Sequence, residues 1–313
     1  MELISLDDIR TAVANLDGVT VRTPLLPCRL DDRDGLWLKP ENLQPIGAFK
    51  LRGAYHAMAV LPPDVRARGV VTHSSGNHGR ALAYAAKAFG VPAVIVVPDT
   101  APAIKIEAMR ALGAELLLVP PAERESRMHE VVAERGMVPI PPFDHRDVIA
   151  GQGTIGVEII EDMPDVETVL VPVGGGGLSS GVATAIKALR PEVAVIGVEP
   201  EFAADARDSL HAGELRKWPI EQTYRTMADG VRTAPSELTL AHLIAHLDDI
   251  VTVTESQIGR AVGLLAREAH LVVEPSGALG PAAFLAGDYG RTVAVVTGGN
   301  IDPDLFAKLI AEV

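Results

Sequence analysis

The sequence holds a single cysteine, Cys28, among its 313 residues. One thiol can neither close an internal disulfide nor supply a cysteine-built zinc site. The N-terminal stretch MELISLDDIR lacks the basic region and apolar core of a secretion signal. No apolar run reaches the roughly 18 residues that a membrane span needs. These absences predict a protein of the reducing cytoplasm that has no membrane partner.

Positive charge is also scarce. Lys and Arg total 28 against 41 Asp and Glu, which gives a formal net charge of −13. This balance argues against nucleic acid as a partner, and it means that an anionic ligand needs a locally prepared site. Hydrophobic residues make up 48% of the chain and charged residues 22%, the proportions of a globular protein. We find neither a low-complexity tract nor an internal repeat of about 20 to 50 residues.

Short apolar runs alternate with helix-like segments over most of the chain. The predicted strands are 70–73, 93–97, 116–119, 169–173, 193–198, 250–253 and 293–297. The predicted helices are 78–89, 103–112, 179–189, 255–268 and 278–285. Several strands are continuous β-branched runs, as expected for a parallel sheet that is buried on both faces. The pattern predicts an α/β fold with an open sheet, whose ligands sit at the carboxyl ends of the strands.

Four consecutive glycines, Gly174, Gly175, Gly176 and Gly177, separate the predicted strand 169–173 from a helix. Such a run is costly in conformational entropy, but its backbone N–H groups can curl round an anion at the helix N-terminus. We interpret it as a phosphate site, and the alternative is a flexible connection. No Lys-Ser/Thr pair follows, so it is not a Walker loop, and Ser180 stands where a dinucleotide fingerprint has glycine.

A second candidate anion loop, SSGNHG at 74–79, follows the predicted strand 70–73. Hydroxyl groups, an amide and free N–H groups at a helix start can bind a carboxylate. The alternative is ordinary helix capping, which needs only one such residue. His73 and His78 have no third metal ligand nearby, so we interpret them as structural.

Lys50 follows a loop that contains proline and glycine, and it has apolar neighbours. Burial lowers the pKa of a lysine and yields the neutral amine that Schiff-base chemistry requires. The alternative is a lysine that reaches to solvent from an apolar helix.

Five segments, in order along nearly the whole chain, carry a family resemblance. They are ENLQPIGAFKLRGA around Lys50, THSSGNHG at 72–79, IAGQGT at 149–154, PVGGGGL at 172–178, and EPSGALG with TGGN at 274–280 and 297–300. The sequence resembles the fold-type II (tryptophan synthase β-like) pyridoxal-phosphate (PLP) enzymes, in the serine/threonine dehydratase and serine racemase group. The resemblance implies a large PLP-binding domain from 1–71 and 147–313, and a small mobile domain from 72–146.

The resemblance also implies roles for single residues. Lys50 would form the Schiff base with PLP, with Phe49 near the ring face and Thr297 at the pyridine nitrogen. The PLP phosphate would be held by Gly174, Gly175, Gly176, Gly177 and the N–H of Leu178. Asn77 would donate to the phenolic oxygen. The substrate carboxylate would be surrounded by Ser74, Ser75, Asn77 and His78, with Arg127 as a further candidate near the domain closure.

A metal site is implied by the same resemblance. In racemase-like members of the group, two carboxylates and one backbone carbonyl bind a divalent cation, and the matching positions are Glu199, Ala203 and Asp205. Oxygen ligands suit Mg²⁺ or Ca²⁺. The alternative is an acidic helix start that binds no metal.

The expected activity is dehydration of an L-serine or L-threonine type substrate to a 2-keto acid and ammonia. At position 143 this sequence has phenylalanine, where it resembles microbial threonine or hydroxyaspartate dehydratases rather than mammalian serine racemases. Ser75, which racemase-like members share, predicts some serine racemisation as a second catalytic role. Alternatives are a serine racemase, a threo-3-hydroxyaspartate dehydratase or, from other classes, a nicotinamide-dependent oxidoreductase or a non-catalytic ligand sensor. Members of the group are often dimers, so we expect a homodimer.

Overall fold

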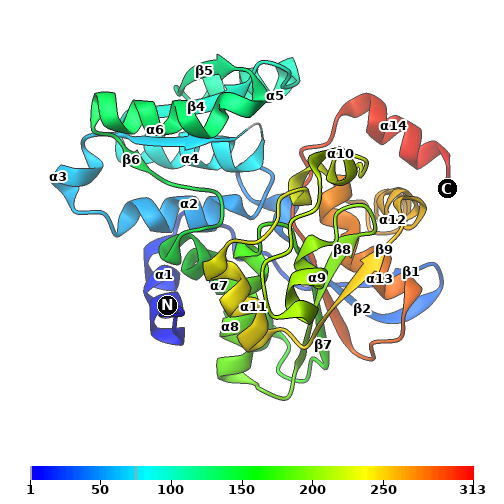
Figure 1. The fold of residues 1–313 in the computed structure, drawn as a ribbon. Helices are drawn as coiled ribbons and strands as arrows, with labels where there is room; N and C mark the ends of the chain where they lie inside the picture. Colours follow the sequence, from blue (N-terminus) through cyan, green and yellow to red (C-terminus); the bar gives the residue numbers. More distant parts are fainter. Residues whose placement is uncertain (1, 75) are drawn as a thin grey trace.

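The computed structural model of the chain describes residues 2–74 and 76–313. The predicted site residue Ser75 therefore lies outside the described residues. Two β-sheets with helices packed around them make up the described chain, as Figure 1 shows. The predicted α/β class is confirmed.

The larger sheet has six strands in the order β1-β2-β10-β7-β8-β9. Its strands are β1 (Leu26–Leu30), β2 (Arg33–Pro40), β7 (Thr168–Pro172), β8 (Ala194–Pro200), β9 (Asp249–Val253) and β10 (Thr292–Val296). β1 pairs antiparallel with β2, and the other neighbours are parallel. All residues of β7 and β10 are buried, as expected for central strands covered on both faces.

The smaller sheet has four parallel strands in the order β5-β4-β3-β6. They are β3 (Val70–His73), β4 (Ala93–Pro98), β5 (Glu115–Val119) and β6 (Val138–Pro139). Together with α4, α5 and α6 it forms the upper left part of Figure 1. The chain enters this sheet from the larger one and returns to it, an arrangement in keeping with an inserted domain. The boundaries 72–146 stay a prediction.

Helices fill the connections between strands. They are α1 (Leu6–Leu16), α2 (Lys50–Ala59), α3 (Pro63–Arg66), α4 (Asn77–Phe89), α5 (Ala103–Arg110), α6 (Arg124–Arg135), α7 (Arg146–Asp162), α8 (Gly177–Leu189), α9 (Asp205–Ala212), α10 (Ile220–Thr223), α11 (Glu237–His246), α12 (Glu255–Glu268), α13 (Leu279–Ala286) and α14 (Pro303–Ala311). Short 3₁₀ turns are η1 (Glu41–Leu43), η2 (Pro121–Glu123), η3 (Asp229–Val231) and η4 (Pro275–Ala278). No helix in this described part of the chain combines the length and the apolar character that a membrane crossing requires.

The core of the larger sheet has two sides, and β7 contributes to both. Leu170 packs into the cluster formed with α12 and α13. Val169 and Val171 point the other way, into the cluster formed with α7 and α8. Alternate residues of a strand face opposite sides, so a continuous apolar run serves both layers.

A buried ionic cluster ties α2 to its neighbours. The Arg52 guanidinium donates to Glu41 at 2.8 Å and to Glu158 at 2.6 Å. Lys39 Nζ lies 2.6 Å from the same Glu158 carboxylate. Two cations and two carboxylates share this site, so their charges balance where water is excluded. The cluster joins β2, η1, α2 and α7, and it fixes the helix that carries Lys50.

All seven predicted strands and all five predicted helices are present, with ends that differ by at most a few residues. The sequence interpretation missed β1, β2 and β6, and it also missed long helices such as α1 and α7.

Candidate active site

Lys50 opens α2 after a tight turn. In this turn Gly47 has a φ of +74°, and a Cβ there would meet Asn300 Oδ1 at 2.7 Å. Lys50 is half-buried, and its Nζ donates to the main-chain oxygen of Pro142 at 2.8 Å. Burial lowers the pKa of Lys50 to about 8. The amine is therefore far easier to deprotonate than that of an ordinary lysine.

The glycine run forms the turn between β7 and α8, the place predicted for a phosphate. Gly176 has a φ of +85°, in the left-handed region that favours glycine. A Cβ at Gly175 would meet the Phe143 ring at 2.4 Å, and one at Gly174 would meet Val231 Cα at 2.7 Å. The turn is thus packed so closely that side chains have no room. Its N–H groups lie at the start of a helix, where no intrahelical acceptor exists.

Lys50 and the glycine turn are joined through two consecutive residues. Pro142 accepts the hydrogen bond from Lys50 Nζ. The next residue, Phe143, contacts the positions where Cβ atoms of Gly175 and Gly177 would lie. The structure therefore brings the reactive amine and the anion turn to one place, although they are far apart in sequence.

Thr297 and Phe49 lie beside Lys50. Thr297 follows β10 and is buried, and its main-chain oxygen accepts from the N–H of Phe49 at 3.0 Å. The Lys50 Nζ lies 5.0 Å from the centre of the Phe49 ring. These contacts place both predicted cofactor residues at the carboxyl end of the central strand, where ligands bind in open α/β sheets.

Asn77, the first residue of α4, reaches the larger sheet through its amide. Its Oδ1 accepts from Asn300 Nδ2 at 2.7 Å, and its Nδ2 donates to Glu274 Oε1 at 2.6 Å. Asn300 Nδ2 also donates to the main-chain oxygen of Ile46 at 3.0 Å, close to Lys50 in sequence. Asn77 is thereby placed in the same site.

Two of the predicted substrate residues, Ser74 and His78, form hydrogen bonds within the loop between β3 and α4 and to Ile140. Ser74 directly follows β3, and its hydroxyl accepts from the N–H of Gly76 at 3.2 Å. His78 is buried, and its Nε2 lies 2.9 Å from the main-chain oxygen of Ile140. Since a carbonyl only accepts, Nε2 carries the proton. Burial and the nearby Lys50 lower the pKa of His78 to about 3, so its ring is neutral at physiological pH.

Within the described residues, Arg127 pairs with side chains of its own helix. Its guanidinium pairs with Glu130 at 2.6 Å and with Glu134 at 3.3 Å, both on its own helix α6. Side chains three and seven positions apart share one face of a helix, which explains the arrangement. The role of Arg127 as a carboxylate ligand stays a prediction.

Comparison with known proteins identifies the family. The family model described as "Pyridoxal-phosphate dependent enzyme" matches residues 16–298. The chain belongs to this family. It is 43% identical to the L-threonine ammonia-lyase of Thermotoga maritima, with 98% of this chain and 78% of that protein covered. It is 39% identical to the L-threo-3-hydroxyaspartate ammonia-lyase of Saccharomyces cerevisiae, over 97% of this chain and 95% of that protein. Among solved structures, maize serine racemase matches with a TM-score of 0.92 and 35% identity, over 99% of this chain and 98% of that one.

PLP is the cofactor of this pyridoxal-phosphate dependent enzyme, and the site fits it. The packed glycine turn offers N–H groups to a phosphate and leaves no room for side chains. Lys50 offers an amine of lowered pKa close to that turn. Both ends of the cofactor, aldehyde and phosphate, thus find chemically matched groups.

Sequence reasoning assigned no role to Glu274, Asn300 or Arg80, which lie in this site. Glu274 and Asn300 stand in the EPSGALG and TGGN segments that carried the resemblance. The signal was an acidic residue inside an otherwise apolar, glycine-rich segment. A carboxyl group that is buried without a cation in hydrogen-bond reach has a perturbed pKa, and such groups are found mostly at functional sites.

The predicted metal residues lie together outside this site, at the end of β8 and the start of α9. Glu199 is buried, and its two oxygens accept from the N–H groups of Ala206 at 3.1 Å and Arg207 at 2.8 Å. Asp205 is 2% exposed, and its Oδ1 has no hydrogen-bond partner among the described residues. Burial, together with the neighbouring Asp205, raises the pKa of Glu199 well above its usual range. A bound cation would give the Asp205 Oδ1 a partner and would favour the ionised form of Glu199. Both observations are therefore compatible with the predicted metal site.

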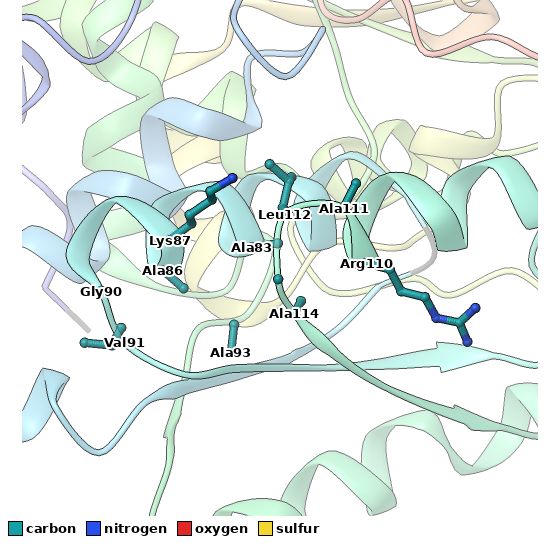
Figure 2. A pocket seen from close by; sticks show the side chains of 11 residues that line it. Ala83, Ala86, Lys87, Gly90, Val91, Ala93, Arg110, Ala111, Leu112 and Ala114 are labelled. Carbon is teal, nitrogen blue, oxygen red and sulfur yellow. The ribbon is translucent and has the colours of Figure 1, made fainter.

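A separate hollow of about 390 Å³ lies on the smaller sheet side, between α4 and α5. Figure 2 shows Lys87 and Arg110 on two different helices, with small alanine side chains between them. None of the predicted cofactor or substrate residues lines it. It is therefore distinct from the candidate active site.

Proposed function

We propose that the protein is a PLP-dependent dehydratase, an ammonia-lyase that converts a β-hydroxy amino acid of the L-serine or L-threonine type to a 2-keto acid and ammonia. The observation that carries the proposal is the Lys50 amine, which has a pKa lowered to about 8 and lies next to the glycine turn. Relatives that match nearly the whole of this chain bear names of this activity, including the L-threonine ammonia-lyase of Thermotoga maritima.

The chain's own residues divide the work as follows. When bound, PLP supplies an electron sink for the carbanion formed at the substrate Cα. The uncharged Lys50 Nζ is the base that takes the Cα proton. The turn Gly174–Gly177 and the N–H of Leu178 hold the cofactor phosphate by main-chain donors. Thr297 offers the pyridine nitrogen a neutral hydroxyl rather than a carboxylate, which favours elimination over transamination.

Ser74, Asn77 and His78 are proposed to bind the substrate carboxylate. Asn77 and His78 offer their main-chain N–H groups at the start of α4, Ser74 offers a hydroxyl, and the neutral His78 ring fixes the loop through Ile140. The racemisation proposed for Ser75 lies outside the described residues, and it rests on the sequence resemblance alone. Serine racemase and threo-3-hydroxyaspartate dehydratase are the alternative activities, and relatives of both names match this chain. A cytoplasmic location and a homodimer stay proposals from the sequence.

We also propose that Mg²⁺ or Ca²⁺ binds at Glu199, Asp205 and the main-chain oxygen of Ala203. Two carboxylates and one carbonyl are the hard oxygen ligands that these cations prefer. The buried Asp205 Oδ1, which has no partner in the described part of the chain, supports this proposal.

A substrate panel tests the activity. Purified protein loaded with PLP is incubated with L-serine, L-threonine, threo-3-hydroxyaspartate and phenylserine, and ammonia and keto acid are measured. We expect keto acid from L-serine or L-threonine, and D-serine as a minor product from L-serine. Lys50→Ala should abolish turnover and the visible band, whereas Lys87→Ala, at an exposed position, should keep both. No keto acid from any substrate would refute the dehydratase proposal.

A further inference from the structure

The segment 2–16, which ends with the helix α1, is fastened to the rest of the molecule by a histidine ring. The main-chain N–H of Ile4 donates to Nε2 of His242 on α11 at 2.9 Å. His242 is completely buried, and Ile4 is 4% exposed. The bond therefore joins two positions that are 238 residues apart, at a place from which water is excluded.

The protonation state of His242 follows from its two partners. Its Nδ1 lies 2.7 Å from the main-chain oxygen of Leu238. A carbonyl only accepts, so Nδ1 carries the proton, and the N–H of Ile4 only donates, so Nε2 carries none. The ring is therefore neutral and has a single tautomer. A second proton, on Nε2, would point at the N–H of Ile4 and break the bond.

The surroundings of His242 also disfavour a second proton. Burial lowers the pKa of His242, the hydrogen bond to Leu238 opposes this effect, and His246 and Arg146 lower the pKa further. Arg146 belongs to α7 and His246 to α11, and Lys187 of α8 acts in turn on His246. The helix α9 packs against α11 as well, but within the described chain none of its charged groups acts on His242.

The sign of the pH dependence follows from this lowered pKa. Above pH 6.5, the ordinary pKa of histidine, His242 is neutral whether the segment is docked or released, and docking has its full strength. As the pH falls below this value, the released state binds the proton more readily, so docking weakens. At about pH 5, one proton raises the released fraction at most about 30-fold.

The other polar contacts of this segment do not depend on a histidine. Arg146, the first residue of α7, donates to the main-chain oxygen of Glu2 and lies 3.6 Å from the carboxylate of Asp8. Ile9 packs on Gly153 of α7, where a Cβ would meet Ile9 Cδ1 at 2.7 Å. Arginine keeps its charge throughout the range considered, so these contacts are unaffected by the protonation of His242.

A second histidine, His56 on α2, faces the far end of α1. Its Nδ1 lies 3.2 Å from Nδ2 of Asn15. An amide group can turn over and present its oxygen instead, so this contact survives protonation of His56. The N–H of Ile4 has no such alternative. His242, and not His56, is therefore the acid-sensitive contact of the segment.

The helix α7, beside α1 in Figure 1, connects this segment with the helices that carry the candidate active site. A Cβ at Gly151 would meet Gly53 Cα of α2 at 2.6 Å, and a Cβ at Gly156 would meet the main-chain oxygen of Val182 of α8 at 2.7 Å. The helix α2 begins with Lys50, and α8 begins in the glycine turn. Packing this close leaves α7 no room to shift alone, so its support reaches both helices.

We propose that the segment 2–16 is an acid-released strap: protonation of His242 breaks its bond to Ile4, frees the segment from α7 and α11, and loosens the cofactor site behind them. The effect on the cofactor rests on the proposed binding of PLP at Lys50, whereas the release of the strap does not. Acidification then releases the cofactor before the protein unfolds as a whole.

Hydrogen–deuterium exchange of the PLP-loaded protein at about pH 7.5 and about pH 5 tests the release of the strap. The peptide 2–16 is compared with a peptide of β7, and both are corrected for the intrinsic pH dependence of exchange. In the wild type we expect the protection of 2–16 to fall about tenfold at the lower pH, and that of β7 to stay unchanged. An equal loss in both peptides would indicate global unfolding and overturn the inference.

His242→Gln removes the titration and keeps an acceptor near the position of Nε2. We expect its protection of 2–16 to differ less than about twofold between the two pH values. His270→Gln is the matched control, because His270 is exposed and follows α12, and it should respond like the wild type. A response of His242→Gln as large as that of the wild type would overturn the inference.

If His242→Gln does not fold, the wild type alone decides. The logarithm of the released fraction, followed between about pH 7 and about pH 5, should rise with a slope that approaches one proton below pH 6.5. A flat profile would overturn the inference.

Release of PLP after dilution is followed in parallel by the absorbance of the bound cofactor. At about pH 5 the wild type should lose PLP at least about threefold faster than His242→Gln, and at about pH 7.5 the two rates should agree. Equal rates at both pH values would overturn the coupling of the strap to the site. A wild type that binds no PLP would overturn the proposed function, and the exchange of peptide 2–16 would still decide whether the strap is released.

Discussion

The lowered pKa of Lys50 can be measured without cofactor or substrate. Burial penalises the ammonium form and sets the pKa at about 8 instead of 10.5. At pH 7 about one tenth of the Lys50 side chains are then uncharged, against roughly three in ten thousand for an ordinary lysine. The ratio is about 300-fold, and it decides how readily the amine condenses with an aldehyde.

Competitive acetylation of the apoprotein with trace acetic anhydride measures this quantity. Peptides containing Lys50 and the exposed Lys87 are quantified by mass spectrometry between about pH 6 and about pH 10. We expect Lys50 labelling to rise through a midpoint near pH 8, while Lys87 labelling keeps rising to the highest pH. Reconstitution with PLP should speed up over the same range as Lys50. If Lys50 and Lys87 gave parallel curves, burial would not tune this amine, and the reasoning would be refuted.

Three further predictions concern other parts of the molecule. Gly175→Ala places a methyl group against the Phe143 ring, at 2.4 Å without relaxation, so PLP affinity should fall more than about tenfold by titration of apoprotein; unchanged affinity would contradict the phosphate turn. Arg52→Met leaves Glu41 buried without its cation and should lower the free energy of unfolding by about 3–5 kcal/mol in urea denaturation; a loss below about 1 kcal/mol would show the cluster to be dispensable. Mg²⁺ or Ca²⁺ should raise the Tm of the wild type but not of Asp205→Asn, and an equal rise in both would place the cation elsewhere.

The sequence predicted the elements that carry strong apolar runs and failed where the signal was weak. The hairpin of β1 and β2 turns at Asp31 and Asp32, whose φ angles are +54° and +60°. Such turns usually contain Asn-Gly or Asp-Gly, so two aspartates gave no recognisable signal. β6 has only two residues, too few for any periodicity.

The sequence indicates candidate site residues where the signal lies within one local segment. Lys50 and the glycine turn each stand in a run whose composition is unusual by itself. The contact between Asn77 and Glu274 joins positions 197 residues apart, and no spacing rule connects them. Arg127, proposed as a further candidate near the domain closure, pairs with two glutamates of its own helix, and its role as a ligand stays a prediction.

The position of β10 has a consequence for how the protein is made. This strand pairs with β2 through Ala294 and Leu38 and also with β7, so the middle of the larger sheet stays vacant until the last part of the chain has left the ribosome. The smaller sheet, whose strands all precede residue 140, can assemble much earlier. Such long-range pairing is slow to form. We therefore expect a nascent chain that ends before β10 to be unable to capture PLP, even though Lys50 and the glycine turn have already been synthesised.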